Sequence, residues 1–240
     1  MLYYNKLLYY NTFMTNKIQT YLLTLIFSVF LLISTANADV KVVTSIKPIH
    51  SLVSYIMDGV GKPDVIVDGY NSPHGFSLKP SHAKMLENAD LVIWIGEDLE
   101  AFLEKPLETI AKKAKNIEVM DLNGITKLAF REKNIFESHA EHDDHKEHDD
   151  HKEKDGHEGH AHGEHDPHVW LDPMNAKIMI KEITKQLIKL DSTNSSVYKS
   201  NSKKALAELD KLIKDTKRDL NKDLRFVVFH DAYQYFENRF

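Results

Sequence analysis

The chain has 240 residues, a formal net charge of −5 and no cysteine. Without cysteine it can form neither disulfide bonds nor thiolate metal sites, so its stability must come from a packed core. The mild charge offers no basic field of the kind that nucleic-acid-binding proteins use. The length suffices for one large or two small domains.

The N-terminal residues have the pattern of an export signal. An uncharged, mostly apolar run from Tyr21 to Ile33 precedes the small-residue box Ala36-Asn37-Ala38. This run is shorter than the roughly 20 residues of a membrane-spanning helix, which favours a cleaved signal peptide over an anchor. We expect residues 1–38 to be that signal peptide, with residues 1–13 a candidate misassigned start, because a start at Met14 gives the usual short basic leader. The expected product is a freely soluble protein of the Gram-negative periplasm.

From residue 40 onward, short β-branched runs alternate with helical patterns. Such alternation predicts βαβ units, a parallel sheet and an α/β fold. The run 91–95 has no polar break, as expected for a central strand that is covered on both faces. The expected strands are 40–45, 64–67, 91–95 and 117–121, and the expected helices are 48–60, 81–88 and 99–115.

A histidine-rich tract interrupts this pattern at residues 138–166. Ten of the fourteen histidines lie between His139 and His168, and the tract carries three lysines against eleven acidic residues, a net charge of −8. Because it has almost no large apolar residue, we expect a mobile loop inserted in the domain. Imidazole is the commonest zinc ligand, so the tract predicts weak metal binding. The candidate ligands are His139, His142, His145, His148, His151, His157, His160, His162 and His165.

Two helices are expected after the tract, at 174–190 and 194–222. The second is long and very polar, with apolar positions at helical spacing, which predicts a connector lying across the outside of the molecule. These positions are Ala205, Leu206, Leu209, Leu212 and Ile213. A buried strand at 225–229 and a helix at 232–240 should then begin another sheet. One strand and one helix cannot bury their own apolar faces, so the sequence looks like a fragment with an incomplete second lobe.

Three histidines lie where separate elements can converge. His74 is in a loop punctuated by proline and glycine after the strand 64–67, and such loops hold ligands in parallel α/β sheets. His168 precedes an apolar segment, and His230 ends the strand 225–229. A lone histidine in such a position is more often structural than a metal ligand, so spacing alone leaves both readings open.

Other polar and aromatic residues near these histidines have simpler interpretations. His50 and His82 fall within expected helices and are interpreted as structural. Asp172 and Asp231 are candidates either to orient an imidazole or to cap a turn. Tyr233, Tyr235 and Phe236 are expected in the core.

Four motifs, in order, resemble one protein family. They are Ser72-Pro73-His74 with Phe76 to Ser81, Asn88 to Gly96 leading to Glu100-Ala101-Phe102, His168 to Pro173, and Phe226 to Tyr233. Together with the acidic tract just before His168, they are similar to the periplasmic zinc-binding protein of high-affinity ABC-type zinc importers.

The resemblance implies two α/β lobes of the metal-binding solute-binding type, joined by a long rigid helix, with zinc in the cleft. By motif, the ligands would be His74 and His168 from the first lobe and His230 from the second. Manganese-binding relatives typically have Glu where His230 stands, and three imidazoles suit Zn²⁺. Some members have Glu where Pro73 stands, so the fourth ligand remains open between water, a residue of the tract and a residue outside this chain.

The expected function is capture of Zn²⁺ and its delivery to the membrane permease of an ABC-type zinc importer, by a monomer that is not an enzyme. One alternative is a secreted zinc hydrolase, since three histidines and a water also form a catalytic geometry. Against it, the chain has no His-Glu-x-x-His segment. The other alternative is a periplasmic metal buffer in which only the His-rich tract matters. The expected divisions are a signal peptide (1–38), a first lobe (39–193), a linking helix (194–222) and the start of a second lobe (223–240).

Overall fold

The computed structural model describes residues 14, 17, 19, 21, 39–131, 164–221, 223, 225–228 and 230–240. The chain divides into two compact units, residues 1–38 and 39–240. Most of the expected signal peptide lies outside the described residues. So do residues 132–163, which include most of the tract and every low-affinity candidate except His165. Among the helices that are described, none combines the length and the apolar character needed to cross a membrane.

A four-stranded parallel sheet forms the centre of the second unit. Its strands are β1 (Val42–Ile46), β2 (Asp64–Val67), β3 (Leu91–Trp94) and β4 (Lys115–Glu118), in the order β2-β1-β3-β4. All residues of β1 and β3 are buried, which agrees with their composition, β-branched or apolar at every position except Ser45. The expected parallel sheet is therefore confirmed.

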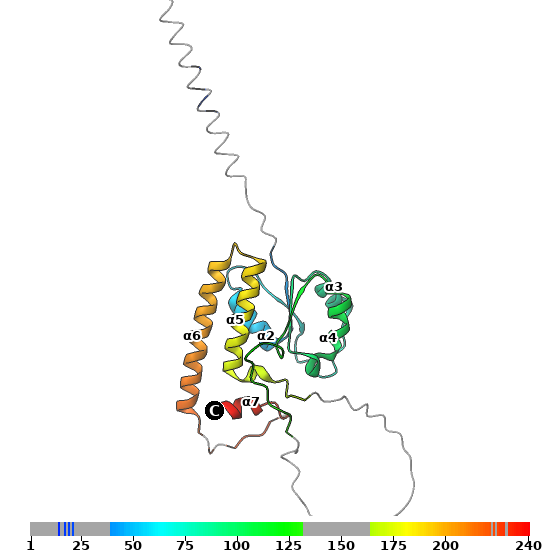
Figure 1. The fold of residues 1–240 in the computed structure, drawn as a ribbon, viewed down its shortest axis with the longest axis vertical. Coiled ribbons are helices and arrows are strands. Elements are labelled where there is room, and N and C mark those ends of the chain that lie inside the picture. The colour runs from blue at the N-terminus through cyan, green and yellow to red at the C-terminus, as the bar shows by residue number, and fades with distance from the viewer. Residues whose placement is uncertain are drawn as a thin grey trace, which may run out of the picture. The chain divides into compact units, whose positions relative to one another are not determined.

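Helices cover both faces of the sheet (Figure 1). One face carries α2 (Lys47–Ile56) and α5 (Pro173–Leu190), with α6 (Ser195–Asp219) packed outside them, and the other carries α3 (Pro80–Glu87) and α4 (Glu97–Thr109). The crossovers from β1 to β2 and from β2 to β3 run in opposite directions, so the order reverses between β1 and β3. In open α/β sheets, ligands bind beyond the carboxyl ends of the strands at such a reversal.

Two helices end earlier than the sequence pattern predicts. The helix α2 stops at Ile56 because the chain turns there, and Gly59 adopts a left-handed φ of 80°. The helix α4 ends at Thr109, whereas the expected helix extends to residue 115. Lys115 instead begins β4, where its backbone N–H donates to the carbonyl of Asp90 at 2.9 Å. Strand pairing with β3 thus overrides local helix propensity.

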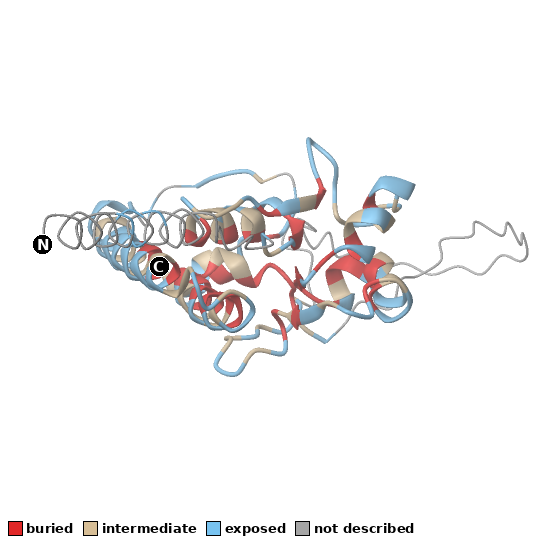
Figure 2. Ribbon diagram, turned by 90° about the horizontal axis from the view of Figure 1, so that it is seen from above, coloured by how far each residue is buried: buried red, intermediate tan, exposed pale blue. Residues whose placement is uncertain are grey.

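The core lies between the sheet and the inner sides of the helices, where buried residues gather (Figure 2). In α6 the N-terminal half carries the buried residues Tyr198, Asn201, Ser202 and Ala205, and Leu206 and Leu209 pack partly buried against the core. Leu212, another of the expected apolar positions, is 52% exposed. The remaining C-terminal turns of α6 are mostly polar and exposed.

The expected buried strand at 225–229 is also wrong among the described residues. Residues 225–228 have no strand structure, and Phe226 and Val227 are 55% and 92% exposed. A strand needs a neighbour for its hydrogen bonds, and no described strand lies beside this one. The helix α7 (Gln234–Arg239) follows. Tyr235 is buried as expected, Phe236 is half-buried, and Tyr233 is 41% exposed and not in the core.

Candidate metal centre

His74 lies in the loop between β2 and α3, beyond the carboxyl end of the sheet. The loop is shaped by local hydrogen bonds: the Asn71 amide donates to the Asp68 carbonyl at 2.6 Å, and the backbone N–H of His74 donates to the Ser72 hydroxyl at 3.1 Å. Gly75 has a φ of 72°, a conformation that side chains other than glycine rarely adopt. The imidazole of His74 is exposed at this turn.

His168 follows residues 165 and 166, the last two of the tract, which pair with residues 128 and 129. Ala129 forms an antiparallel bridge with half-buried His165, and the backbone N–H of Asp166 donates to the carbonyl of Leu128 at 2.8 Å. Asp166 is only 2% exposed. The expected mobile loop therefore does not include residues 165 and 166, because strand-like pairing with residues 128 and 129 holds them in place.

The Asp166 carboxylate is in direct contact with His168. Its Oδ1 lies 2.6 Å from Nδ1 of the His168 imidazole and accepts the backbone N–H of His168 at 2.9 Å. Both side chains are buried. Of the two aspartates considered from the sequence, neither is hydrogen-bonded to this imidazole; Asp166 fills that role.

Asp172 caps a helix and forms an ion pair instead. Its Oδ1 accepts the backbone N–H of Met174 at the start of α5, at 2.8 Å. The Arg239 guanidinium of α7 donates to both carboxylate oxygens, from Nε at 2.8 Å and from Nη2 at 2.6 Å. Asp231 pairs with Arg131 at 3.5 Å. Both aspartates thus attach the C-terminal segment to the sheet unit.

The segment that carries His230 is fastened further by Tyr235 and Gln234. The Tyr235 hydroxyl accepts the N–H of Leu128 at 2.9 Å and donates to the carbonyl of Asp166 at 2.6 Å. The Gln234 amide donates to the carbonyl of Ala129 at 2.9 Å. These contacts hold α7 against the base of the tract, immediately beside His168.

The three histidines therefore converge. One ring nitrogen from each of His74, His168 and His230 lies within 4.8 Å of the others, and this is the sole His, Asp, Glu or Cys group of that kind among the residues described. The two Nε2 atoms of His168 and His230 are 3.3 Å apart. Zn–N bonds of 2.0–2.1 Å in a tetrahedral site put neighbouring nitrogens about 3.3 Å apart. One edge of such a tetrahedron is thus already formed.

The histidines interpreted as structural have structural contacts. A ring nitrogen of His50 lies 3.1 Å from the carbonyl of Pro63. His82 accepts the backbone N–H of Lys79 at the start of α3 and stacks on Phe76, with 5.5 Å between ring centroids. That interpretation is confirmed for both residues.

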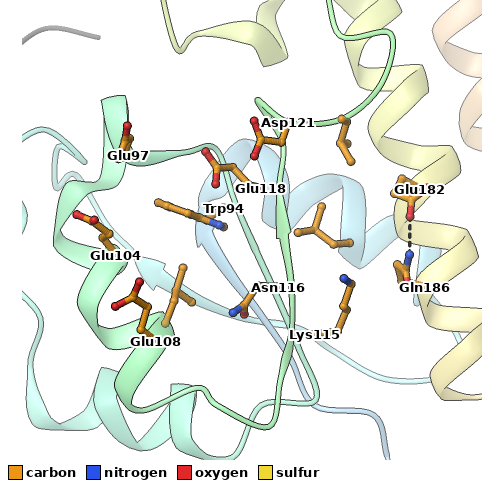
Figure 3. Close-up of a pocket in the computed structure, with 13 residues that line it drawn as sticks. Trp94, Glu97, Glu104, Glu108, Lys115, Asn116, Glu118, Asp121, Glu182 and Gln186 are labelled. Atoms are coloured by element: carbon orange, nitrogen blue, oxygen red, sulfur yellow. Dashed lines mark hydrogen bonds between the residues drawn. The ribbon is translucent and has the colours of Figure 1, made fainter.

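A separate acidic groove follows the exposed edge of β4 (Figure 3). Glu97, Glu104 and Glu108 of α4 line one side of it, and Glu182 and Gln186 of α5 line the other. Burial, followed by the charges of nearby acidic residues, raises the pKa of Glu118 in this groove to about 7. The groove contains no histidine, and its carboxylates do not converge at metal-ligand distances. Charged side chains at a sheet edge also discourage pairing with other chains.

Glu100 is a second carboxyl with a raised pKa, at the carboxyl end of β3. Its Oε2 accepts the backbone N–H groups of Ile95 and Gly96 at 2.8 and 3.0 Å. Burial raises the pKa of Glu100 to about 7, although the hydrogen bonds that its carboxylate accepts oppose the shift.

Comparison with protein families decides the classification. The family described as the periplasmic component A of the zinc-uptake complex, ZnuA, matches residues 42–240. The chain belongs to this family. The high-affinity zinc uptake system protein ZnuA of Brucella abortus (strain 2308) is 47% identical over 223 residues. That alignment covers 86% of this chain and 66% of the relative, so the chain spans slightly less than two thirds of the relative's length.

Solved ZnuA structures share the fold. A crystal structure of ZnuA has a TM-score of 0.65 at 24% identity, covering 84% of this chain and 68% of that one. A zinc-bound deletion mutant of ZnuA has a TM-score of 0.65 at 25% identity, covering 84% and 67%. The expected α/β fold of the metal-binding solute-binding type is confirmed. The family description and the names of these relatives concern zinc uptake and give no support to the hydrolase alternative.

Sequence reasoning missed the residues that support the ZnuA histidines. Asp166 has a local signal, since it stands two residues before His168 in the run Asp166-Pro167-His168, but the acidic composition of residues 138–166 places it in the tract. Tyr235 contacts Asp166, which is 69 positions earlier in the chain, and Arg239 contacts Asp172, which is 67 positions earlier. No local sequence pattern predicts contacts over such separations. Their roles emerge only when α7 docks.

Proposed function

We propose that this chain captures Zn²⁺ in the periplasm through His74, His168 and His230 and delivers it to the permease of an ABC-type zinc importer. The observation that carries the proposal is the convergence of three imidazoles in a member of the ZnuA family. Zinc is the cargo, and the only bonds that form and break are those between the metal and its ligands.

The donor set favours zinc over harder cations. Neutral imidazoles suit Zn²⁺, whereas Mg²⁺, Ca²⁺ and Mn²⁺ prefer sites rich in carboxylate oxygens. The ring nitrogens of the three histidines lie within 4.8 Å of one another, and bound zinc would hold them at the edge length of about 3.3 Å of an ideal tetrahedral site. A fourth donor, such as a water molecule or a residue of the tract, completes the tetrahedron.

The proposed organisation follows from the same function. Residues 1–38 direct export as a signal peptide, residues 39–193 form the first lobe, and α6 links it to a second lobe that begins at residue 223. The protein acts as a monomer in a Gram-negative periplasm, and the His-rich tract supplies several weak metal sites near the three histidines. Each of these weak sites must order the chain that provides it, which limits its affinity.

The test is a competitive Zn²⁺ titration of the protein lacking residues 139–163, beside the same protein with His74→Ala, His168→Ala and His230→Ala. The deletion retains the buried Asp166 and removes eight of the tract's candidate ligands. We expect one tight site in the deletion variant and a loss of affinity of at least about 100-fold in the triple variant, because three zinc ligands are removed.

A matched control carries His50→Ala and His82→Ala, which remove two histidines that have structural contacts. It should keep the tight site. If the deletion alone abolishes tight binding, the metal-buffer alternative is correct and the three converging histidines are not the capture site.

A further inference from the structure

The Asp166 side chain is buried beside a histidine that the proposed function makes a zinc ligand. Its Oδ1 accepts the backbone N–H of His168 at 2.9 Å and lies 2.6 Å from Nδ1 of the same residue. A carboxylate oxygen accepts hydrogen bonds, so the 2.6 Å contact assigns the proton of a neutral imidazole to Nδ1. The lone pair is then on Nε2.

That assignment turns the metal-binding atom of His168 toward the other histidines. Its Nε2 is the atom that lies 3.3 Å from Nε2 of His230. With the opposite tautomer, Nε2 would carry a proton and could not accept a metal ion, while Nδ1 would oppose the carboxylate with its own lone pair. Asp166 therefore selects the one tautomer that can coordinate zinc in this position.

Asp166 is itself held from outside its own segment. The Tyr235 hydroxyl of α7 donates to its backbone carbonyl at 2.6 Å, and its backbone N–H donates to Leu128 at 2.8 Å. At 2% exposure, the carboxylate has almost no water with which to exchange its hydrogen bonds. The orientation is fixed before any metal arrives.

We propose that Asp166 is a positioning residue, which holds the imidazole of His168 in the Nδ1–H tautomer with Nε2 directed at the metal. The proposal rests on the proposed zinc-binding function and adds a residue that acts through a ligand without touching the metal. Partners of this kind typically change metal affinity by roughly 10- to 100-fold.

The experiment compares Asp166→Ala and Asp166→Asn with the unchanged protein by two measurements. Long-range ¹⁵N–¹H correlation spectra of the metal-free protein report the tautomer of His168, and competitive titration reports its Zn²⁺ affinity. In Asp166→Ala we expect the Nε2–H tautomer to become populated and zinc affinity to fall roughly 10- to 100-fold. In Asp166→Asn the amide oxygen can still accept Nδ1–H, so both changes should be smaller.

Asp191→Ala is the matched control. Asp191 also accepts hydrogen bonds, from Tyr198 and Asn194, but it lies at the far end of the 18-residue helix α5, about 27 Å from the start of that helix. The control should change neither the tautomer nor the affinity.

Three results would decide against the proposal or against its basis. An unchanged tautomer in Asp166→Ala overturns it, and so does an affinity loss no greater than in Asp191→Ala. If the unchanged protein binds no zinc tightly, the proposed function fails, but the tautomer measured without metal still decides whether Asp166 orients His168.

Discussion

The forces that stabilise the sheet unit differ from those that attach the C-terminal segment, residues 225–240. In the sheet unit, β1 and β3 are buried along their whole length and pack against apolar helix faces. In the segment, Phe226 and Val227 are exposed, and attachment depends on the burial of Tyr235 together with the polar contacts of Tyr235 and Arg239. Apolar burial is strong but non-directional, whereas hydrogen bonds fix distances and angles. The stable part of the molecule thus differs from the part that sets the spacing of the histidines.

The largest effect should come from a cavity in the sheet. Ile93 of β3 is fully buried, so Ile93→Ala should lower the free energy of unfolding by about 4 kcal/mol through lost burial and an unfilled cavity. Urea unfolding followed by circular dichroism measures the change. Leu212→Ala on the exposed side of α6 is the control and should stay within about 0.5 kcal/mol of the original protein. If both changes lowered the free energy of unfolding equally, Ile93 would not contribute more to stability than the exposed Leu212, and the prediction would be wrong.

The second largest effect should be a pH dependence of the free energy of unfolding, caused by Glu100 in the sheet unit. Burial raises the pKa of Glu100 to about 7 in the folded protein, above the 4.5 of the unfolded chain. The folded state therefore binds the proton more tightly, and the stabilisation is present below pH 4.5 and is lost as pH rises through about 7. Between pH 5 and pH 8 the loss amounts to roughly 2.5 kcal/mol.

Glu100→Gln isolates this contribution. Gln cannot ionise, so the variant should gain stability relative to the original protein as pH rises, and urea unfolding at several pH values measures the difference. Glu182→Gln, at the rim of the acidic groove, is the control. A difference between Glu100→Gln and the original protein that does not change from pH 5 to pH 8 would show that Glu100 does not titrate in this range.

A smaller and more local effect is expected from Arg239→Gln. The change leaves the Asp172 carboxylate, which is almost completely buried, without its charged partner, and it should cost about 1.5 kcal/mol because Arg239 itself is partly exposed. Hydrogen exchange should accelerate in residues 230–240 and stay unchanged in β1. Arg218→Gln, which removes surface ion pairs of α6, should change neither region. If exchange in β1 rises as much as in 230–240, the two regions unfold as one unit and the contrast fails.

The same contrast explains what the sequence predicts and what it does not. The strands β1 and β3 follow from β-branched and apolar runs, because burial on both faces leaves a local signature. The edge strand β4 lacks this signature, since only Ile117 in it is buried, and it begins at Lys115, two residues before the expected strand. His74, His168 and His230 follow from motifs and their order. The apolar run at 225–229 has the same signature, yet forms no strand among the described residues, since a strand also needs a partner strand. Pairs such as Asp172 with Arg239 have no periodicity and become visible only in three dimensions.

Residues 128 and 129 pair with residues 165 and 166. The position of His168, a proposed metal ligand, therefore does not depend on the length of the segment between these pairs. Both ends of that segment are anchored to each other by backbone hydrogen bonds. Insertions or deletions between the anchors therefore need not shift Asp166 or His168. Evolution can lengthen, shorten or rewrite the histidine repeats there while the geometry of the proposed capture site stays constant.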